Sequence, residues 1–209
     1  LPAEWEPQSG IMLTWPHADT DWGPQLDDIY PVFAAIGSVI AAGELLLSVC
    51  RSATHAATVG QWLLQSGAPA DRLRFCIADS NDTWARDHGP LTTLVDNTPL
   101  LNDFGFNGWG GKFDADLDSA ITGRLQSAGV FANAEVRQRP LVLEGGALET
   151  DPSGNLEPDV DAARCQAAVR ALRRFSSSES TSACSSRDML KNQNINQAMG
   201  HVLIIQGTS

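Results

Sequence analysis

The sequence has few cysteines, and none of them forms a pattern typical of a zinc site or a disulfide framework. Cys50, Cys76, Cys165 and Cys184 are dispersed along 209 residues without a Cys-x-x-Cys pair. Cys50 and Cys76 lie in apolar runs, where we expect them to pack as small hydrophobic side chains. No metal and no cofactor is therefore predicted. A reducing compartment is the default for such a chain, so we expect a cytoplasmic location.

Basic residues are also scarce. The chain has 14 Lys and Arg against 25 Asp and Glu, which gives a formal net charge of −11. This balance argues against nucleic acid and anionic membrane surfaces as partners, and it suits a cationic ligand. No apolar run approaches the ~20 residues that cross a bilayer. The first residues also have neither the basic nor the apolar region of a signal peptide.

Short apolar runs alternate with segments of helical periodicity, and this alternation indicates an α/β domain. Apolar residues make up 43% of the chain, an ordinary share for a globular core. Four-residue spacing and Gly stops predict helices over 29–43, 53–66 and 117–125. Strands are predicted at 11–15, 45–50, 73–77, 91–95, 100–104 and 141–143.

Polar clusters follow the predicted strands, at 17–22, 81–90 and 106–112. Glu144 is a fourth polar position, because it comes directly after three apolar strand residues and before two glycines. A carboxylate there would be unfavourable deep in a core, so we expect it at a strand end. Loops at strand ends often carry function in α/β folds. We therefore expect these segments to meet in one acidic cleft lined by tryptophan.

Residues 81–90 contain the highest concentration of side chains that could bind a ligand or act in catalysis. Asp82 and Asp87 could bind a planar cation by charge-assisted hydrogen bonds, and Trp84 could supply a flat apolar wall or a cation–π face. The alternative is a polar turn in which Arg86 pairs with an aspartate, because structural ion pairs and functional sites look alike in sequence. Trp109 lies among three glycines that permit positive φ. The alternative interpretation of this segment is a flexible turn in which Trp109 is simply a buried aromatic side chain.

Beyond Asn155 the character of the chain changes. A helix could span 159–175, residues 176–186 are a serine-rich low-complexity segment, and 201–205 could form a last strand. We therefore divide the chain into an N-terminal part, 1–155, and a poorly integrated part, 156–209.

Three segments in the N-terminal part together resemble a known family, namely Asn81-Asp82-x-Trp84-x-Arg86-Asp87-x-Gly89-Pro90, Phe106-Asn107-Gly108-Trp109-Gly110-Gly111-Lys112 and Leu143-Glu144-Gly145-Gly146. Trp15-Pro16-His17 and Thr20-Asp21-Trp22 agree with it. The family is that of agmatine deiminase and the bacterial peptidylarginine deiminases, and the resemblance covers about residues 2–155.

The resemblance implies a pentein-type fold, a five-fold α/β propeller of ββαβ units that is incomplete here. It implies hydrolysis of a guanidinium group, for example agmatine to N-carbamoylputrescine and ammonia, as in polyamine biosynthesis. Asp87 and Glu144 would be catalytic by motif match. Trp84, Asp82, Trp109 and Asp21 would bind the small cationic guanidino substrate. The open edges of an incomplete ring favour association or partial unfolding, so a homo-oligomer is one possibility.

The chain departs from the family after Gly146. The family's His-x-Asp pair and nucleophilic cysteine follow the Glu-Gly-Gly signature, and nothing there matches either in this sequence. His17-Ala18-Asp19 has the residue types of the His-x-Asp pair but precedes the first motif. One hypothesis is that residues after about 155 come from a frameshifted reading frame. The functional alternatives are a deiminase-type chain with little activity, a non-catalytic guanidinium or polyamine binder, and an amidino-transfer enzyme. Agmatine and peptidyl-arginine both stay open as substrates.

Overall fold

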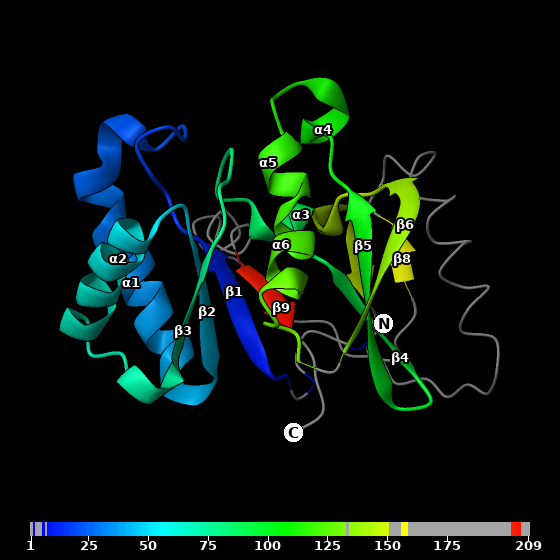
Figure 1. The fold of residues 1–209 in the computed structure, drawn as a ribbon, viewed down its shortest axis with the longest axis horizontal. Helices are drawn as coiled ribbons and strands as arrows, with labels where there is room; N and C mark the ends of the chain where they lie inside the picture. Colours follow the sequence, from blue (N-terminus) through cyan, green and yellow to red (C-terminus); the bar gives the residue numbers. More distant parts are fainter. Residues whose placement is uncertain are drawn as a thin grey trace.

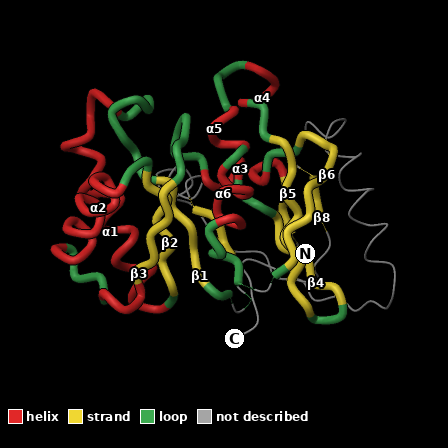
Figure 2. The backbone as a smooth tube through the Cα atoms, viewed as in Figure 1, coloured by secondary structure: helices red, strands yellow, loops and turns green. Residues whose placement is uncertain are grey.

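The computed structural model describes residues 2, 6, 8–132, 134–150, 156–158 and 202–205. Two separate β-sheets dominate this part of the chain, with helices outside the first sheet and between the two (Figure 1). Figure 2 shows the same arrangement as two groups of strands separated by helical segments. The described residues therefore form a layered α/β structure, as the alternating sequence pattern predicts.

The first sheet has the strand order β3-β2-β1-β9. Its strands are β1 (Gly10–Thr14), β2 (Leu45–Cys50), β3 (Leu73–Ile77) and β9 (Val202–Ile205). β1, β2 and β3 are parallel, whereas β9 pairs antiparallel with β1. The connections are η1 (Gly23–Gln25) with α1 (Leu26–Gly43), and α2 (Ala53–Gln65) with η2 (Ala70–Arg72).

The second sheet has the order β4-β5-β6 and follows a ββαβ path. β4 (Leu91–Val95) and β5 (Thr98–Gly105) form a hairpin whose turn residues, Asp96 and Asn97, both have positive φ. This is the geometry that two-residue hairpins favour. β6 (Glu135–Val142) runs parallel to β5. The remaining elements are α3 (Ala85–His88), α4 (Gly108–Gly111), α5 (Asp116–Ser119), α6 (Ile121–Ser127), η3 (Gly145–Ala147), β7 (Leu148–Thr150) and β8 (Leu156–Pro158).

Two apolar cores hold these layers together. Outside the first sheet, Phe33 and Ala34 of α1 pack with Leu63 of α2 and Leu46 of β2. On its other face, Ile121 and Leu125 of α6 share a core whose other members include Met12, Leu47, Val49, Cys76 and Leu101. Because that core takes residues from both sheets, α6 joins them into one unit.

Helix α1 begins at Leu26, earlier than the predicted start at residue 29. Pro31 is therefore the sixth helical residue instead of a residue of the first turn, where proline is best tolerated. Its missing N–H affects the carbonyl of Asp27, which lies on the exposed side of the helix, where water can bind it. The segment Gly23–Gly43 is also long and apolar enough to cross a membrane by length and composition. It contains Asp27 and Asp28, so it is not a continuous apolar run of ~20 residues, and its buried residues Phe33, Ala34 and Ala41 belong to the core outside the first sheet.

The C-terminal part of the chain is only sparsely described. Residues 156–209 were expected to be poorly integrated, yet β9 forms a ladder with β1 from Gly10↔Ile205 to Leu13↔Val202. The strand expected at 201–205 is confirmed over 202–205. The helix expected at 159–175 and the serine-rich segment 176–186 lie outside the described residues. The division at residue 155 and the five-fold ring stay predictions.

Candidate functional site

The polar segments meet because the parallel strands end at the same edge of each sheet. Directly after β1, Trp15 N–H donates to Val49 O over 3.0 Å, and after β3, Ala78 N–H donates to Cys50 O over 3.0 Å. In the second sheet, Leu143 N–H continues the ladder to Gly105 O over 3.1 Å. The loops that follow β1, β3, β5 and β6 therefore leave their sheets at corresponding ends, as the sequence reasoning expected.

Asp82 organises the loop that contains it. One oxygen, Oδ1, accepts from Thr83 N–H over 2.9 Å, and Oδ2 accepts from the Trp84 indole N–H over 3.0 Å. The Trp22 indole N–H, from the loop after β1, donates to the Thr83 hydroxyl over 3.0 Å. Asp82 and Trp84 are both half-buried. Asp82 thus fixes the direction of the Trp84 ring.

Trp84 and Trp109 form an aromatic wall. Their ring centroids are 5.6 Å apart and the ring planes meet at 87°. Trp109 also contacts Phe106 and Phe113 edge-on, at 5.1 and 5.7 Å. This geometry suits the ring quadrupoles, and it leaves polarisable faces that attract cations. Trp109 is therefore part of a half-buried aromatic cluster, where the sequence alone left a flexible turn as an alternative.

The glycine-rich segment forms a turn in the left-handed region of φ. Gly108, Trp109, Gly110 and Gly111 have φ of 64, 59, 85 and 79°. Such values are easy for glycine, but they are unfavourable for tryptophan by about 1–2 kcal/mol. The Asn107 side chain supports the turn by accepting from Gly110 N–H over 2.9 Å. The glycines thus provide the positive φ that the sequence reasoning anticipated.

Asp87 lies against the Glu-Gly-Gly segment. Gly146 N–H donates to Asp87 Oδ1 over 3.0 Å. A Cβ on Gly145 would lie 2.2 Å from the Arg86 carbonyl oxygen, so only glycine permits this approach of α3 to η3. Glu144 directly precedes this pair and is half-buried, as is Asp87. The structure thus brings the two predicted catalytic residues to one region, while their roles stay predictions.

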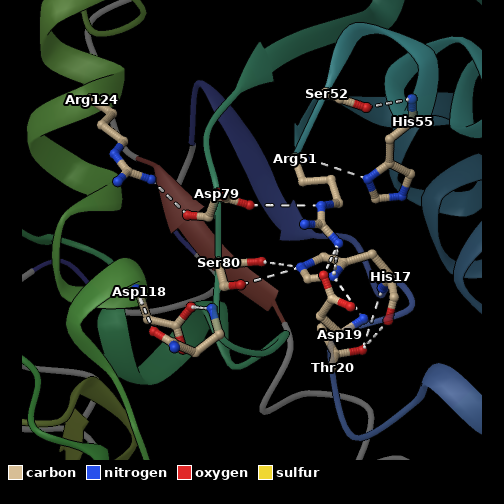
Figure 3. A network of polar contacts seen from close by, with 11 residues as sticks. His17, Asp19, Thr20, Arg51, Ser52, His55, Asp79, Ser80, Asp118 and Arg124 are labelled. Carbon is tan, nitrogen blue, oxygen red and sulfur yellow. Dashed lines mark hydrogen bonds and ion pairs between the residues drawn. The ribbon is translucent and has the colours of Figure 1, made fainter.

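His17 holds the loops after β1 and β3 together (Figure 3). Its Nδ1 accepts from Asp19 N–H and from Arg51 Nη1, both over 3.3 Å, so Nε2 carries the proton. Nε2 lies 3.2 Å from Ser80 O and 3.1 Å from Ser80 Oγ. Burial, followed by the charge of Arg51, lowers the pKa of His17. The His17-Ala18-Asp19 triplet is therefore built into a polar network, in which Arg51 also forms an ion pair with Asp19.

His55 corrects a sequence expectation. From the sequence alone we expect a surface or capping histidine here, near the start of the second predicted helix, because nothing nearby pairs with it. Instead it is buried, accepts from Arg51 N–H over 3.2 Å, and lies 2.9 Å from the Tyr30 hydroxyl. Burial lowers its pKa to about 4, with further lowering from His17 and Arg51. Ser52 caps helix α2 by accepting from His55 N–H over 3.1 Å.

Two buried residues near the site escaped the sequence reasoning. Asp118 is buried beside the 81–84 loop, and burial raises its pKa to about 6 against the backbone hydrogen bonds that it accepts. His88 follows Asp87 and lies 3.2 Å from the Thr14 hydroxyl through Nε2. Complete burial lowers the pKa of His88 to about 3, so it is neutral. In the sequence, Asp118 is distinguished only by its place among the acidic residues at the start of a helix.

Asp21, Cys50 and Cys76 complete the sequence candidates that the structure describes. Asp21 is exposed on the loop after β1, next to Trp22. Cys50 and Cys76 are buried, as expected, and burial raises the pKa of Cys50 to about 12 and also raises that of Cys76. Within the described ranges, no group of three or more His, Cys, Asp or Glu could hold a metal ion.

Comparison with known proteins identifies this arrangement. The model of the Porphyromonas-type peptidyl-arginine deiminase family matches residues 1–157, three quarters of the chain and the region that holds every site segment described above. The chain belongs to this family.

Curated relatives of this deiminase-family chain include agmatine deiminases. That of Stutzerimonas stutzeri is 32% identical over 163 residues, and that of Pseudomonas aeruginosa is 31% identical over the same length. Each alignment covers 75% of this chain and 42% of the relative. The chain thus spans about two fifths of the length of these relatives.

Solved structures agree with the family. A Porphyromonas gingivalis protein assigned as an arginine deiminase superposes with a TM-score of 0.67 at 36% identity, covering 83% of this chain and 53% of that one. An agmatine deiminase of C. jejuni with substrate bound gives a TM-score of 0.67 at 24% identity, covering 83% and 52%, and this likeness shows the fold alone. The deiminase-family fold is therefore shared with the part of this chain that was compared.

Proposed function

We propose that this chain forms the cation-binding side of a hydrolase that cleaves a guanidino group, with agmatine as substrate. One observation carries the proposal. The Asp87 carboxylate is anchored by Gly146 N–H at 3.0 Å, next to Glu144. Trp84 lies three residues before Asp87 and contacts Trp109, whose segment follows β5, the strand that pairs with the end of β6 just before Glu144. Two carboxylates and aromatic faces are the groups that bind a planar cation.

The chemistry explains why carboxylates are needed. A guanidinium ion donates hydrogen bonds in its own plane, so a carboxylate can bind its nitrogens edge-on and leave the central carbon open from above. Hydrolysis adds water to that carbon and releases ammonia, leaving a ureido product. Orientation of the cation before attack contributes to catalysis, because the reacting atoms are then held about 3–3.5 Å apart. Asp87 and Glu144 would supply this orientation.

The nucleophile is a separate question. The family resemblance assigns it to a cysteine thiolate. Cys50 and Cys76 are unsuited, because burial raises both thiol pKa values and keeps them protonated. Cys165 and Cys184 lie outside the described residues. Loss of a nucleophile typically lowers rates by orders of magnitude while some binding survives. We therefore expect this chain to bind agmatine-like cations and to hydrolyse them very slowly or not at all.

Peptidyl-arginine is the second candidate substrate. The matching family model describes peptidyl-arginine deiminases, whereas the curated relatives are agmatine deiminases. Both substrates present the same guanidinium group, so the Asp87 region does not distinguish them. A non-catalytic guanidinium or polyamine binder remains the alternative to an enzyme.

Calorimetric titration with agmatine tests the binding proposal. Asp87→Ala should raise Kd about ten- to a hundredfold, which corresponds to the ~1.5–3 kcal/mol of a hydrogen bond to a charged group. Asp71→Ala, which removes an exposed charge from η2, is the matched control and should leave Kd unchanged. Equal weakening by both variants would mean that net charge, rather than Asp87, attracts the ligand.

Ammonia release separates the enzyme from the binder. The assay should compare agmatine with an arginine-containing peptide, using the Stutzerimonas stutzeri agmatine deiminase as a positive control. Turnover by this chain at about 1 per second or more, a rate typical of enzymes, would refute the expected inactivity. Such a result would direct attention to Cys165 and Cys184.

A further inference from the structure

Asp118 and Asn81 hold each other's backbones in a reciprocal clamp. Asp118 Oδ1 accepts from Asn81 N–H over 2.7 Å, and both of its oxygens lie 3.3 Å from Asp82 N. In return, Asn81 Oδ1 accepts from Leu117 N–H over 2.8 Å and from Asp118 N–H over 3.3 Å. Each side chain therefore binds two consecutive N–H groups of the other's segment. The two segments are 36 or 37 residues apart in sequence, so nothing local requires this contact.

The clamp connects the two loops that carry the aromatic wall. Asn81 and Asp82 lie three and two residues before Trp84, whose indole N–H donates to Asp82. Asp118 is in α5, which follows the glycine-rich segment that carries Trp109. Phe106, at the start of that segment, donates its N–H to the Ser119 hydroxyl over 3.2 Å. The position of α5 against Asn81 thus bears on the distance between the two tryptophans.

We infer that Asp118 is a positioning residue, which with Asn81 sets the Trp84–Trp109 contact and so the shape of the cation-binding wall. It acts through the loops and does not touch the ligand. Its value for binding rests on the function proposed above, whereas its effect on the two tryptophans does not.

The chemistry of Asp118 favours this role over ordinary helix capping. A carboxylate in the first turn of a helix commonly interacts with that helix's own N-terminus. The Asp118 carboxylate instead accepts from the backbone N–H groups of Asn81 and Asp82, on another segment. The side chain is only 2% exposed. Burying a carboxylate this deeply is unfavourable unless hydrogen bonds compensate. Here the compensating hydrogen bonds come from backbone N–H groups of the loop that carries Trp84.

Two ligand-free measurements on the full chain test the clamp. The first is hydrogen exchange of the Asn81 and Asp82 amides. Asp118→Ala should speed their exchange at least tenfold, and Asn81→Ala should expose the Leu117 and Asp118 amides similarly. The matched control is Asp116→Ala, an exposed acid of the same helix that should change neither. The double variant should be no worse than either single variant, because the clamp acts as one unit and losing either side chain releases both segments.

The second measurement follows the tryptophans directly. In protein labelled with 5-fluorotryptophan, the ¹⁹F signals of Trp84 and Trp109, assigned with Trp→Phe variants, should shift in Asp118→Ala. They should return toward wild type in Asp118→Asn, which keeps one acceptor oxygen, and stay unchanged in Asp116→Ala. Wild-type signals in Asp118→Ala would overturn the inference, even if the variant is less stable.

Agmatine binding gives the third readout. Asp118→Ala should raise Kd about tenfold, with partial recovery in Asp118→Asn. Unchanged Kd in a variant whose tryptophan signals have shifted would refute a role in binding. If the wild-type chain fails to bind agmatine, the proposed function is wrong, and the ¹⁹F signals alone still decide whether Asp118 positions the wall.

Discussion

Replacing Gly145 by alanine should move the two predicted catalytic residues apart. The new Cβ would lie 2.2 Å from the Arg86 carbonyl oxygen, a backbone atom that cannot rotate away. Segment η3 must then separate from α3, which also stretches the Gly146–Asp87 hydrogen bond. Overpacking of this kind typically costs about 1–3 kcal/mol. Because this hydrogen bond is exposed to solvent, we expect its loss to add about 1 kcal/mol, below the ~1.5–3 kcal/mol of hydrogen bonds to charged groups.

Neighbouring glycines offer two comparisons. A Cβ on Gly146 would lie 2.3 Å from Asp87 Oδ1, the end of a side chain that can turn aside. Gly146→Ala should therefore affect stability less than Gly145→Ala, while still weakening agmatine binding. Gly123, inside α6, has open space where a Cβ would go. Gly123→Ala should stabilise the protein by about 0.5–1 kcal/mol, because alanine favours the helix.

Urea unfolding gives the free energies for all three variants. We expect a loss of about 2–4 kcal/mol for Gly145→Ala, the sum of the overpacking term and the weakened hydrogen bond. The order of stability should be Gly123→Ala, then wild type, then Gly146→Ala and last Gly145→Ala. If Gly145→Ala unfolds at the same urea concentration as wild type, α3 and η3 do not make the close contact on which the Asp87–Glu144 site depends.

Two further predictions concern acid and association. Burial lowers the pKa of His55 to about 4 and of His88 to about 3, so the native state binds fewer protons than the unfolded chain below pH ~6.5. Stability should therefore be lost as pH falls from 6.5 toward 4. Asp118, with its raised pKa, opposes this loss, so Asp118→Asn should steepen it between pH 7 and 5. Urea unfolding across this range would reveal either trend, and greater stability at pH 5 than at 7 would contradict the first. Apolar side chains are exposed on the edge strands β4 and β6, including Leu94, Leu141 and Val142. The chain should associate as its concentration rises, and Val142→Lys should reduce this in sedimentation velocity. A wild-type monomer at every concentration would argue against it.

Periodicity and turn residues predicted most of the fold. The bounds of β2, β3 and β4 agree with the predicted strands, because each is a short apolar run between clear stop signals. His55 was misplaced because one of its partners, the Tyr30 hydroxyl, lies 25 residues away on another helix. Its second partner, the Arg51 N–H, is only four residues away, but the apolar surroundings that bury the ring come from other elements. Sequence spacing contains no information about such surroundings.

The candidate site was predictable in outline. Polar residues at strand ends indicated that the segments of Asp87 and Glu144 would lie together, and the Gly146–Asp87 hydrogen bond agrees with this, although the preceding strands, β3 and β6, belong to different sheets. The closeness of that approach depends on two glycines, and only coordinates reveal what a Cβ would strike. Asp118 was missed because an acidic residue at a helix start has an ordinary local explanation. Its actual partners lie 36 or 37 residues earlier.

The left-handed turn at Gly108–Gly111 places a residue needed for ligand recognition in a backbone conformation that lowers stability. Trp109 has φ 59° and ψ 51°, a conformation that asparagine or glycine adopts far more readily. Selection for a more stable chain would therefore tend to replace the ring that completes the aromatic wall. Stabilising substitutions often reduce function in this way. Anyone redesigning the wall for another cation has few choices at this position, since β-branched residues tolerate that backbone poorly. The aromatic face and its backbone must be optimised together.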